Sequence, residues 1–370
     1  MNVMNYKIVV PIVAIAIIIV SVLGYIYVLN PTQGSISLTG AGATFPYPLL
    51  SAMIPQYQQL EANLNLTINY QAIGSGGGIS ALQSKTVDFA GSDAPLSASD
   101  AAKAQNALHI PETIGAVTVS YNLPEIPTGL HLTGQVIADI FAGNVTLWND
   151  QAIQSLNPTK TLPAESILVV HRSDGSGTTF IFTGYLSASS TGWNTAIGQG
   201  KTVAWPVGIG SNGNTGVAAT VQGTPYAIGY VELAYALQNN MTVAAIQNPA
   251  GNWILPSLTT TTTAASSGAS EGLPAGSEDW SAVNLLNEPD AQAYPIVSFS
   301  YILVYKELNV IPDMTHEKAT ELVQFLWWMV HDGQNLASNL EYAQLPTNVV
   351  QLNEASIQSI TFNGANLLTS

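Results

Sequence analysis

Three short turns rich in Gly, Ser and Thr constrain the fold of this 370-residue chain more than any other feature. They lie at residues 40–46, 74–78 and 174–179, and each precedes an expected helix. The second turn follows 65–73, whose β-branched alternation predicts a strand, and the third interrupts 165–187, which has the pattern of a strand, a turn and a helix. Repeated units of this kind favour an α/β fold with largely parallel sheets.

The same alternation continues along the rest of the chain, whose length suits two domains. We expect strands at the start of 88–96, at 112–123, at the start of 226–237 and at 295–306, and helices at 79–87, 135–143, the end of 226–237 and 316–340.

The Thr-rich segment 258–268 has low sequence complexity and predicts a surface loop. Residues 268–272 overlap its end and match the G-x-S-x-G pattern of hydrolases, centred on Ser270. That pattern needs a strand before it and a helix after it, so its position in a polar loop argues against a nucleophile.

Charge and cysteine content exclude several classes of protein. The chain has 8 Lys and Arg against 23 Asp and Glu, a net charge of −15, which argues against a nucleic-acid partner. The absence of cysteine excludes disulfides, thiol catalysis, Cys-ligated zinc and a lipid-modified N-terminal Cys. Charged residues make up only 8%, which suggests an extracytoplasmic protein from an acidic medium. No metal or other cofactor is expected, because the histidines lack ligand spacing; they include His109, His131, His316 and His331.

Residues 8–29 contain no ionisable group other than tyrosine, and spanning a bilayer takes about 20 such residues. Lys7 precedes the run and favours an orientation with the rest of the chain outside the cell. We therefore expect 1–36 to form an uncleaved membrane anchor and a short tether, with a cleaved signal segment as the alternative. Three sequons typical of an exported glycoprotein follow, at Asn65, Asn144 and Asn240.

The three Gly-rich turns have the chemistry of an anion site. Each places backbone N–H groups and hydroxyls at a helix start, where unpaired donors and the helix dipole stabilise negative charge. Arg172 is the only arginine, lies beside the third turn and supplies a planar donor fork suited to a tetrahedral oxyanion. Helix capping alone explains any one turn, and none is a P-loop or a dinucleotide motif. The three turns together with Arg172 favour an anion.

Asp93 offers a way to distinguish tetrahedral anions. A carboxylate can accept the proton that phosphate still carries, whereas fully deprotonated sulfate leaves the carboxylate facing like charge. The alternative is that Asp93 only begins the turn at 93–96. Tyr47, beside the first turn, either lines the site or caps the helix.

Several segments closely resemble the substrate-binding protein of the high-affinity phosphate ABC transporter, in the type II periplasmic binding protein superfamily. The similarity runs from about residue 37 to about residue 348. The matching segments are 40–46, 70–78, 87–96, 172–180, 205–210, 227–232 and 342–346.

The resemblance implies a type II periplasmic-binding-protein-like fold of two α/β lobes that close on one phosphate. Lobe I is expected to comprise 37–120 and 297–370, and lobe II 121–296, with two hinge strands crossing near 119–122 and 294–298. The resemblance also implies delivery of inorganic phosphate to ABC transporter permease subunits with a cytoplasmic ATPase, no cofactor and no enzymatic activity.

The resemblance also assigns roles to residues of the three turns. Thr44 and Ser75 are expected to donate N–H and hydroxyl groups to phosphate, and Phe45 an N–H group. Asp93 is expected to accept the phosphate proton, and Arg172 to donate to phosphate. The third helix start and the supporting residues are Ser176, Gly177, Thr178, Asp174 as the salt-link partner of Arg172, Gly74 and Gly175.

The chain departs from the family pattern in a few places. His171 occupies a position that is often basic in the family, a glycine follows Ser75 where the family has serine, and the membrane run replaces the lipid-anchor cysteine. A phosphatase using the same site is an alternative function, but it requires a nucleophile or a metal-activated water. A phosphate sensor is a third interpretation.

Overall fold

One long strand joins the two halves of the molecule. β4 (Ala107–Tyr121) has 15 residues, all of them buried. Its first part pairs antiparallel with β12 (Val297–Tyr305), and its last part pairs antiparallel with β8 (Ala227–Glu232). The partner changes at Val117, which lies before the predicted crossing at 119–122.

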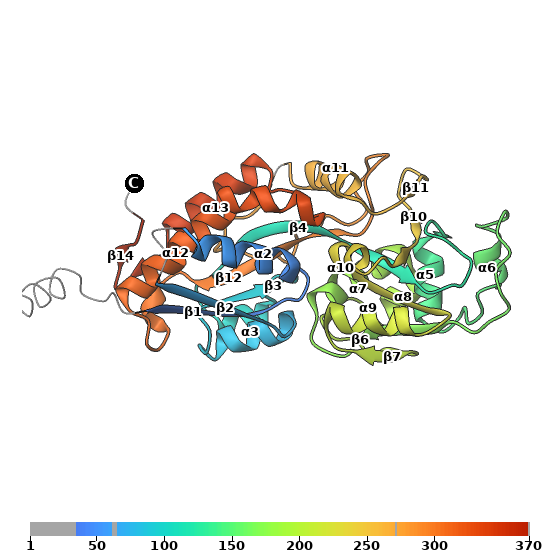
Figure 1. Ribbon diagram of the computed structural model, residues 1–370, viewed down its shortest axis with the longest axis horizontal. Coiled ribbons are helices and arrows are strands. Elements are labelled where there is room, and N and C mark those ends of the chain that lie inside the picture. The colour runs from blue at the N-terminus through green and yellow to red at the C-terminus, as the bar shows by residue number, and fades with distance from the viewer. Residues whose placement is uncertain (1–34, 61–64, 271, 369–370) are drawn as a thin grey trace, which may run out of the picture.

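The computed structural model describes residues 35–60, 65–270 and 272–368. Figure 1 shows their helices and strands in two groups, with β4 extending from one group into the other. The predicted two-domain α/β fold is therefore confirmed. The predicted anchor at 8–29 lies outside the described residues, and within them every helix is too short or too polar to cross a bilayer.

Each half has a parallel centre, but the sheet as a whole is mixed. In the first half, β1 (Ile36–Gly42) runs parallel to β2 (Leu66–Ala72) and to β3 (Phe89–Ser92). In the second half, β6 (Leu168–Arg172) runs parallel to β8 and to β7 (Ile209–Ser211). The prediction of largely parallel sheets is wrong, because the linking strands β4 and β12 pair antiparallel with their neighbours.

Helices and short strands complete the two halves. The helices of the described residues are α2 (Tyr47–Gln58), α3 (Ser75–Gln83), α4 (Ala98–Lys103), α5 (Gly134–Phe141), α6 (Gln151–Gln154), α7 (Gly177–Ser189), α8 (Thr191–Ala196), α9 (Gly213–Gly223), α10 (Leu233–Gln238), α11 (Leu258–Gly268), α12 (His316–Val330) and α13 (Thr347–Gln358), with 3₁₀ turns η2 (Leu308–Val310), η3 (Asp332–Leu336) and η4 (Ser338–Leu340). The short strands are β5 (His131–Leu132), β9 (Thr242–Val243), β10 (Ala245–Gln247), β11 (Trp253–Ile254), β13 (Thr361–Phe362) and β14 (Ala365–Asn366).

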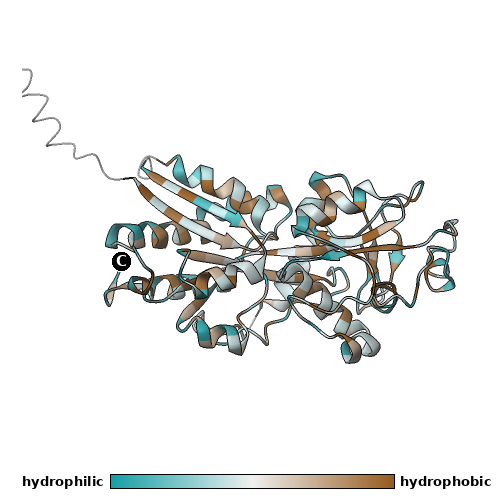
Figure 2. Ribbon diagram, turned by 90° about the horizontal axis from the view of Figure 1, so that it is seen from below, coloured by the Kyte–Doolittle hydropathy of each residue, from teal (hydrophilic) through white to brown (hydrophobic). Residues whose placement is uncertain are grey.

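The helices of the first half cover both faces of its strands. Figure 1 shows α12 and α13 on one side of β1, β2 and β3, and α3 on the other. Hydrophilic and hydrophobic residues alternate along the helix ribbons in Figure 2, as expected for helices with one buried face.

The Thr-rich segment forms α11, so the prediction of a surface loop is wrong. A capping box starts the helix: the Ser257 side chain accepts from the Thr260 N–H, and the Thr260 side chain accepts from the Ser257 N–H. Thr261, Ala264 and Ala265 are buried along one face at helical spacing. Because this face packs on the core, the low-complexity composition does not prevent folding.

The end of α11 packs on the first half, although its residues fall within the predicted lobe II. The side-chain amide of Asn348 donates to the carbonyl oxygen of Ala269 at 2.7 Å. The His109 N–H on β4 donates to the carbonyl oxygen of Gly276 at 2.8 Å. The G-x-S-x-G serine, Ser270, follows a helix rather than a strand, is exposed and donates to the Ser267 carbonyl oxygen.

The helix expected at 316–340 ends earlier, at Val330. His331 leaves helical backbone geometry with φ −115° and ψ −100°, and two 3₁₀ turns follow. Gly333 lies in the first of these turns, where the low helix propensity of glycine favours a break.

Replacing Ser257 with Ala is expected to lower the free energy of unfolding by about 1 kcal/mol, because the first turn of α11 loses its capping acceptor. Urea denaturation followed by circular dichroism measures the loss. Ser266→Ala, at an exposed position of the same helix, is the matched control and should change stability by less than about 0.5 kcal/mol. Equal losses in the two variants would contradict a capping role.

Candidate anion-binding site

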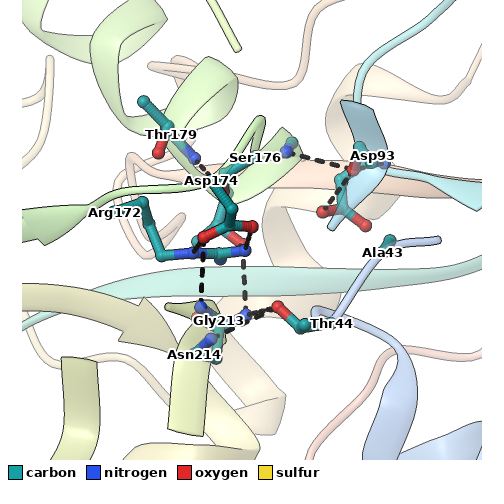
Figure 3. Close-up of polar contacts among 12 residues, drawn as sticks. Ala43, Thr44, Asp93, Arg172, Asp174, Ser176, Thr179, Gly213 and Asn214 are labelled. Carbon is teal, nitrogen blue, oxygen red and sulfur yellow. Dashed lines mark hydrogen bonds and ion pairs between the residues drawn. The ribbon is translucent and has the colours of Figure 1, made fainter. Parts of the chain in front are cut away.

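The three Gly-rich turns meet where the two halves touch, because backbone hydrogen bonds join Gly74 to Gly42 and Gly76 to Gly175. Figure 3 shows Thr44 of the first turn near Arg172 and Asp174 of the second half.

Thr44 precedes α2, Ser75 is the first residue of α3, and Gly177 is the first residue of α7. Asp93 follows β3, and Arg172 is the last residue of β6. All five residues are buried, so the fold gathers predicted residues from distant parts of the chain.

The hydroxyl of Ser75 connects the two halves directly. Its oxygen accepts from the backbone N–H of Asp93 at 3.1 Å and from the backbone N–H of Gly177 at 3.0 Å. The hydroxyl in turn donates to Asp93 Oδ2 at 3.3 Å. One residue further on, the Gly76 N–H donates to the Gly175 carbonyl oxygen at 2.7 Å. The second and third turns are therefore in contact along their backbones.

Two glycines permit this close approach. Gly74 has φ +84°, and a Cβ there would lie 2.3 Å from Asp174 Oδ2. A Cβ on Gly177 would lie 2.5 Å from both Asp93 Oδ2 and Ser75 Oγ. Any side chain at either position would push the two halves apart.

Arg172 is held by acceptors of its own half. Its Nε donates to Asp174 Oδ1 at 2.7 Å, and its Nη2 donates to Asp174 Oδ2. Its Nη1 donates to Thr178 Oγ1 at 3.3 Å. Burial alone would raise the pKa of Asp174, but the hydrogen bonds and charge of Arg172 hold that pKa below its ordinary value. The predicted salt link is present, and it fixes the plane of the guanidinium.

The first turn is anchored through its carbonyl groups. The hydroxyl of Tyr235 donates to the Thr44 carbonyl oxygen at 2.6 Å, and the hydroxyl of Tyr342 donates to the Phe45 carbonyl oxygen at 2.7 Å. The Phe45 ring is fully buried in the core. Phe45 can therefore serve an anion only through its backbone N–H.

Asn214 is a site residue that sequence reasoning missed. It lies in the first turn of α9 and is fully buried. Its side-chain amide donates to Thr44 Oγ1 at 2.9 Å and to Thr178 Oγ1 at 3.2 Å, so it links the two halves. Its neighbour Gly213 donates its N–H to Asp174 Oδ1 at 3.1 Å (Figure 3). The Gly- and Asn-rich turn at 211–214 was the signal available in the sequence.

Unpaired donors remain at these helix starts. Ser176 caps α7, because its Oγ accepts from the Thr179 N–H at 3.0 Å. Across the described ranges, no hydrogen-bond acceptor contacts the backbone N–H groups of Thr44, Phe45, Ser75 and Thr178. Such groups are the donors that an anion at a helix start receives.

Buried carboxyl groups lie beside these donors. Burial raises the pKa of Asp93 to about 7, although hydrogen bonds from Ser300 and Ser75 and the charge of Arg172 act in the opposite direction. Burial likewise raises the pKa of Glu112 to about 8. Asp93 therefore exchanges its proton near neutral pH, where it can either accept a proton or supply one.

His171 and Tyr47, which lie near the turns, pack against aromatic side chains. The His171 ring stacks on Trp205 with 4.8 Å between ring centroids, and its Nδ1 lies 3.1 Å from the Arg172 carbonyl oxygen. Tyr47, which the sequence left ambiguous, is 40% exposed and stacks on Tyr70; it is the first residue of α2, whose N-cap residue is Pro46.

Comparisons with known proteins give a consistent result. A family model described as a PBP superfamily domain matches residues 29–332. The phosphate-binding protein PstS of Xylella fastidiosa is 44% identical over 327 residues, which cover 87% of this chain and 85% of that protein. The phosphate-binding protein PstS of Pasteurella multocida is 44% identical over 316 residues, which cover 85% of this chain and 88% of that protein.

A solved structure has the same fold. The structure of a high-affinity periplasmic phosphate-binding protein bound with phosphate matches with a TM-score of 0.66 and 19% identity. The match covers 86% of this chain and 93% of that chain.

The ligand-free protein is expected to lose stability as pH rises from about 5 to about 8. The unfolded chain releases the protons of Asp93, Glu112 and Glu232 near their ordinary pKa values, whereas burial raises all three pKa values in the folded protein. The folded state thus binds more protons than the unfolded state. The contribution of these protons to the free energy of unfolding is lost as pH rises through the raised pKa values.

Burial lowers the pKa of His109 to about 4 and also lowers the pKa of the less deeply buried His131 and His171, and these three histidines act in the opposite direction. The carboxyls outweigh them, because the pKa values of the three buried carboxyls rise by larger amounts and burial raises the pKa of Glu321 as well.

Urea denaturation at a series of pH values measures this dependence. Each pKa unit of difference corresponds to about 1.4 kcal/mol. Asp93→Asn removes one of the three carboxyls and should make the decline shallower. A free energy of unfolding that increases between about pH 5 and about pH 8 would overturn the assignment.

Proposed function

The chain belongs to the PstS phosphate-binding proteins of the PBP superfamily, and from that premise we propose that it binds inorganic phosphate outside the cytoplasm for uptake by an ABC transporter. One observation carries the proposal. The only arginine of the chain is buried where the starts of α2, α3, α7 and α9 meet, beside the buried carboxyl group of Asp93.

Phosphate lies among donors from both halves. The first half supplies the N–H groups of Thr44, Phe45 and Ser75, whereas the Ser75 hydroxyl donates to Asp93. The second half supplies Arg172 and the start of α7. The residues of that start are Ser176, Gly177 and Thr178, with Asp174, Gly74 and Gly175 as supports.

Asp93 makes the site selective for a protonated anion. It is 2% exposed and is the acceptor among groups that otherwise donate. Phosphate near neutral pH still carries a proton and can donate it to Asp93, whereas sulfate has none to give. A sulfate ion would therefore face a buried carboxylate without a hydrogen bond, an arrangement of high energy.

Contacts between the halves link binding to closure. Ser75 contacts Gly177, Gly76 contacts Gly175, and Asn214 contacts Thr44. An anion that receives donors from both halves stabilises this closed arrangement over an open one. We assign lobe I to 37–120 and 297–370 and lobe II to 121–296, with the end of α11 and Gly276 packing back on lobe I. The closed form is what the permease subunits with their cytoplasmic ATPase recognise.

The chain reaches its partners from the outer side of the membrane. Residues 1–36 anchor the binding domain, or are removed as a signal segment after export. The sequon residues are exposed and accessible for glycosylation; they are Asn65, Asn144 and Asn240.

We infer that the protein is not an enzyme. The Ser75 oxygen already accepts two backbone N–H groups and contacts a carboxyl rather than an imidazole. The His171 ring is engaged with Trp205 and the Arg172 carbonyl oxygen. A phosphatase therefore lacks an activated nucleophile at this site, and turnover of a generic phosphomonoester would overturn the proposal.

Arg172→Ala is expected to weaken phosphate binding by at least about 100-fold, because it removes the permanent donor fork and leaves Asp174 unpaired. Isothermal titration calorimetry with phosphate gives the dissociation constants. Lys103→Ala removes a positive charge from an exposed position and is the matched control, with affinity expected to stay at the wild-type level. Wild-type affinity in Arg172→Ala would refute the site.

Asp93→Asn is expected to reduce the preference for phosphate over sulfate by about tenfold or more, which corresponds to losing one hydrogen bond to a charged group. The amide keeps the shape of the carboxyl but removes the charge that repels sulfate, and it replaces one of the two acceptor oxygens with a donor that can bind sulfate. Parallel titrations with the two anions at one pH measure the ratio. An unchanged ratio would show that Asp93 does not select the ligand.

A further inference from the structure

Glu112 is a buried carboxyl that the phosphate contacts above do not use. It is 1% exposed and lies in β4. Its neighbours Pro111 and Thr113 pair with consecutive residues of β12, so Glu112 is an extra residue at a β-bulge. A bulge redirects side chains, and bulges are frequent beside functional sites.

Ser300 lies between Glu112 and Asp93. Its Oγ is 3.0 Å from Glu112 Oε1 and 2.9 Å from Asp93 Oδ1. A hydroxyl has one hydrogen and can donate to only one of these two oxygens. Both contacts are hydrogen bonds only when one of the carboxyls is protonated and donates to the Ser300 oxygen.

The surroundings place the negative charge on Asp93 and the proton on Glu112. Asp93 receives the Ser75 hydroxyl and faces the charge of Arg172. Glu112 Oε2 is buried and has no hydrogen-bond partner in the described part of the chain. An uncharged carboxylic acid tolerates that surrounding better than a carboxylate does.

The other ionisable groups around the pair do not change this assignment. Arg172 is the only cation that acts on Asp93, and Asp174 pairs with it. Glu232 is buried with a raised pKa and therefore favours its neutral form. The remaining neighbours are tyrosines that burial keeps neutral; they are Tyr70, Tyr235, Tyr301 and Tyr342.

We propose that Glu112 is a positioning residue that retains a proton and, through Ser300, keeps Asp93 ionised as the acceptor of the proton of bound phosphate. Glu112 donates to the Ser300 oxygen, and the Ser300 hydroxyl donates to Asp93. The inference rests on the proposed function, since phosphate is the ligand whose proton Asp93 accepts.

The arrangement has a consequence at alkaline pH. When Glu112 loses its proton, Ser300 stands between two carboxylates and can satisfy only one of them. Repulsion then disfavours the ionised form of Asp93. Phosphate binding in that range requires Glu112 to take up a proton again, so affinity falls as pH rises.

The test is the pH profile of phosphate binding in wild type and in Glu112→Gln. The glutamine amide donates to Ser300 at every pH and removes the ionisation. Above about pH 8, the wild-type dissociation constant should rise up to about tenfold more per pH unit than that of Glu112→Gln, by proton linkage. Calorimetry in buffers of different ionisation enthalpy should show up to about one more proton taken up per phosphate by the wild type.

Two further variants distinguish this role from a structural one. Glu321→Gln makes the same carboxyl-to-amide change on α12 and should keep the wild-type profile. In a Ser300→Ala background, Glu112→Gln should change the profile less than it does in the wild type, because the hydroxyl that connects the two carboxyls is gone and only their through-space repulsion remains. Superimposable profiles of wild type and Glu112→Gln would overturn the proposal.

A ligand-free measurement separates this inference from the proposed function. If wild type binds no phosphate at any pH, the proposed function fails. The carboxyl pair is then tested by urea denaturation between about pH 5 and about pH 8. Glu112→Gln should make the decline in the free energy of unfolding shallower, by the slope that the release of about one proton contributes. An unchanged decline overturns the assignment of the proton to Glu112.

Discussion

Burial of the Arg172 guanidinium is the constraint on which the rest of the structure depends. A guanidinium does not lose its proton in a protein, so a side chain that is only 3% exposed has to be surrounded by acceptors. Asp174 provides two of them and Thr178 a third. Because Asp174 offsets the charge, attraction for an anion depends as much on the neutral N–H donors at the helix starts as on the guanidinium.

This constraint divides the site between the two halves. The acceptors of Arg172 belong to the second half, whereas Ser75 and Asp93 belong to the first. The donors surround a ligand from both sides only when the halves touch, and β4 and β12 hold them in register at that point. Glu112 lies on β4 and Ser300 on its neighbour β12, so the carboxyl pair sits in the first half, a few residues before β4 changes partner at Val117.

The parts of the site that could be predicted from the sequence are those set by short stretches of neighbouring residues. The turns before α3 and α7 combine glycine with hydroxyl residues, and both the helix starts and the donors follow from those residues. The functions of Ser300 and Glu112 depend on contacts between distant segments, and a single sequence contains no sign of them. For Asn214 the Gly- and Asn-rich turn at 211–214 indicates a turn, but not the contact with Thr44. The helix α11 is a different case, because its capping box and buried alanines were present in the sequence but were obscured by its threonine content. The mixed sheet was missed because strand patterns do not reveal which strands pair antiparallel.

The net charge of −15 is compatible with binding an anion. Repulsion by surface carboxylates and attraction by the donors of the site operate over different distances. Surface carboxylates act on a bound anion through water and salt, and at physiological ionic strength their field decays over about 8 Å. The donors at the helix starts act at hydrogen-bond distance in a dehydrated site, where electrostatic interactions are stronger. The buried acids add repulsion only when they ionise, and burial raises the pKa of Glu112 and of Glu232. An acidic protein can therefore recognise an acidic ligand, provided that Glu112 and Glu232 keep their protons.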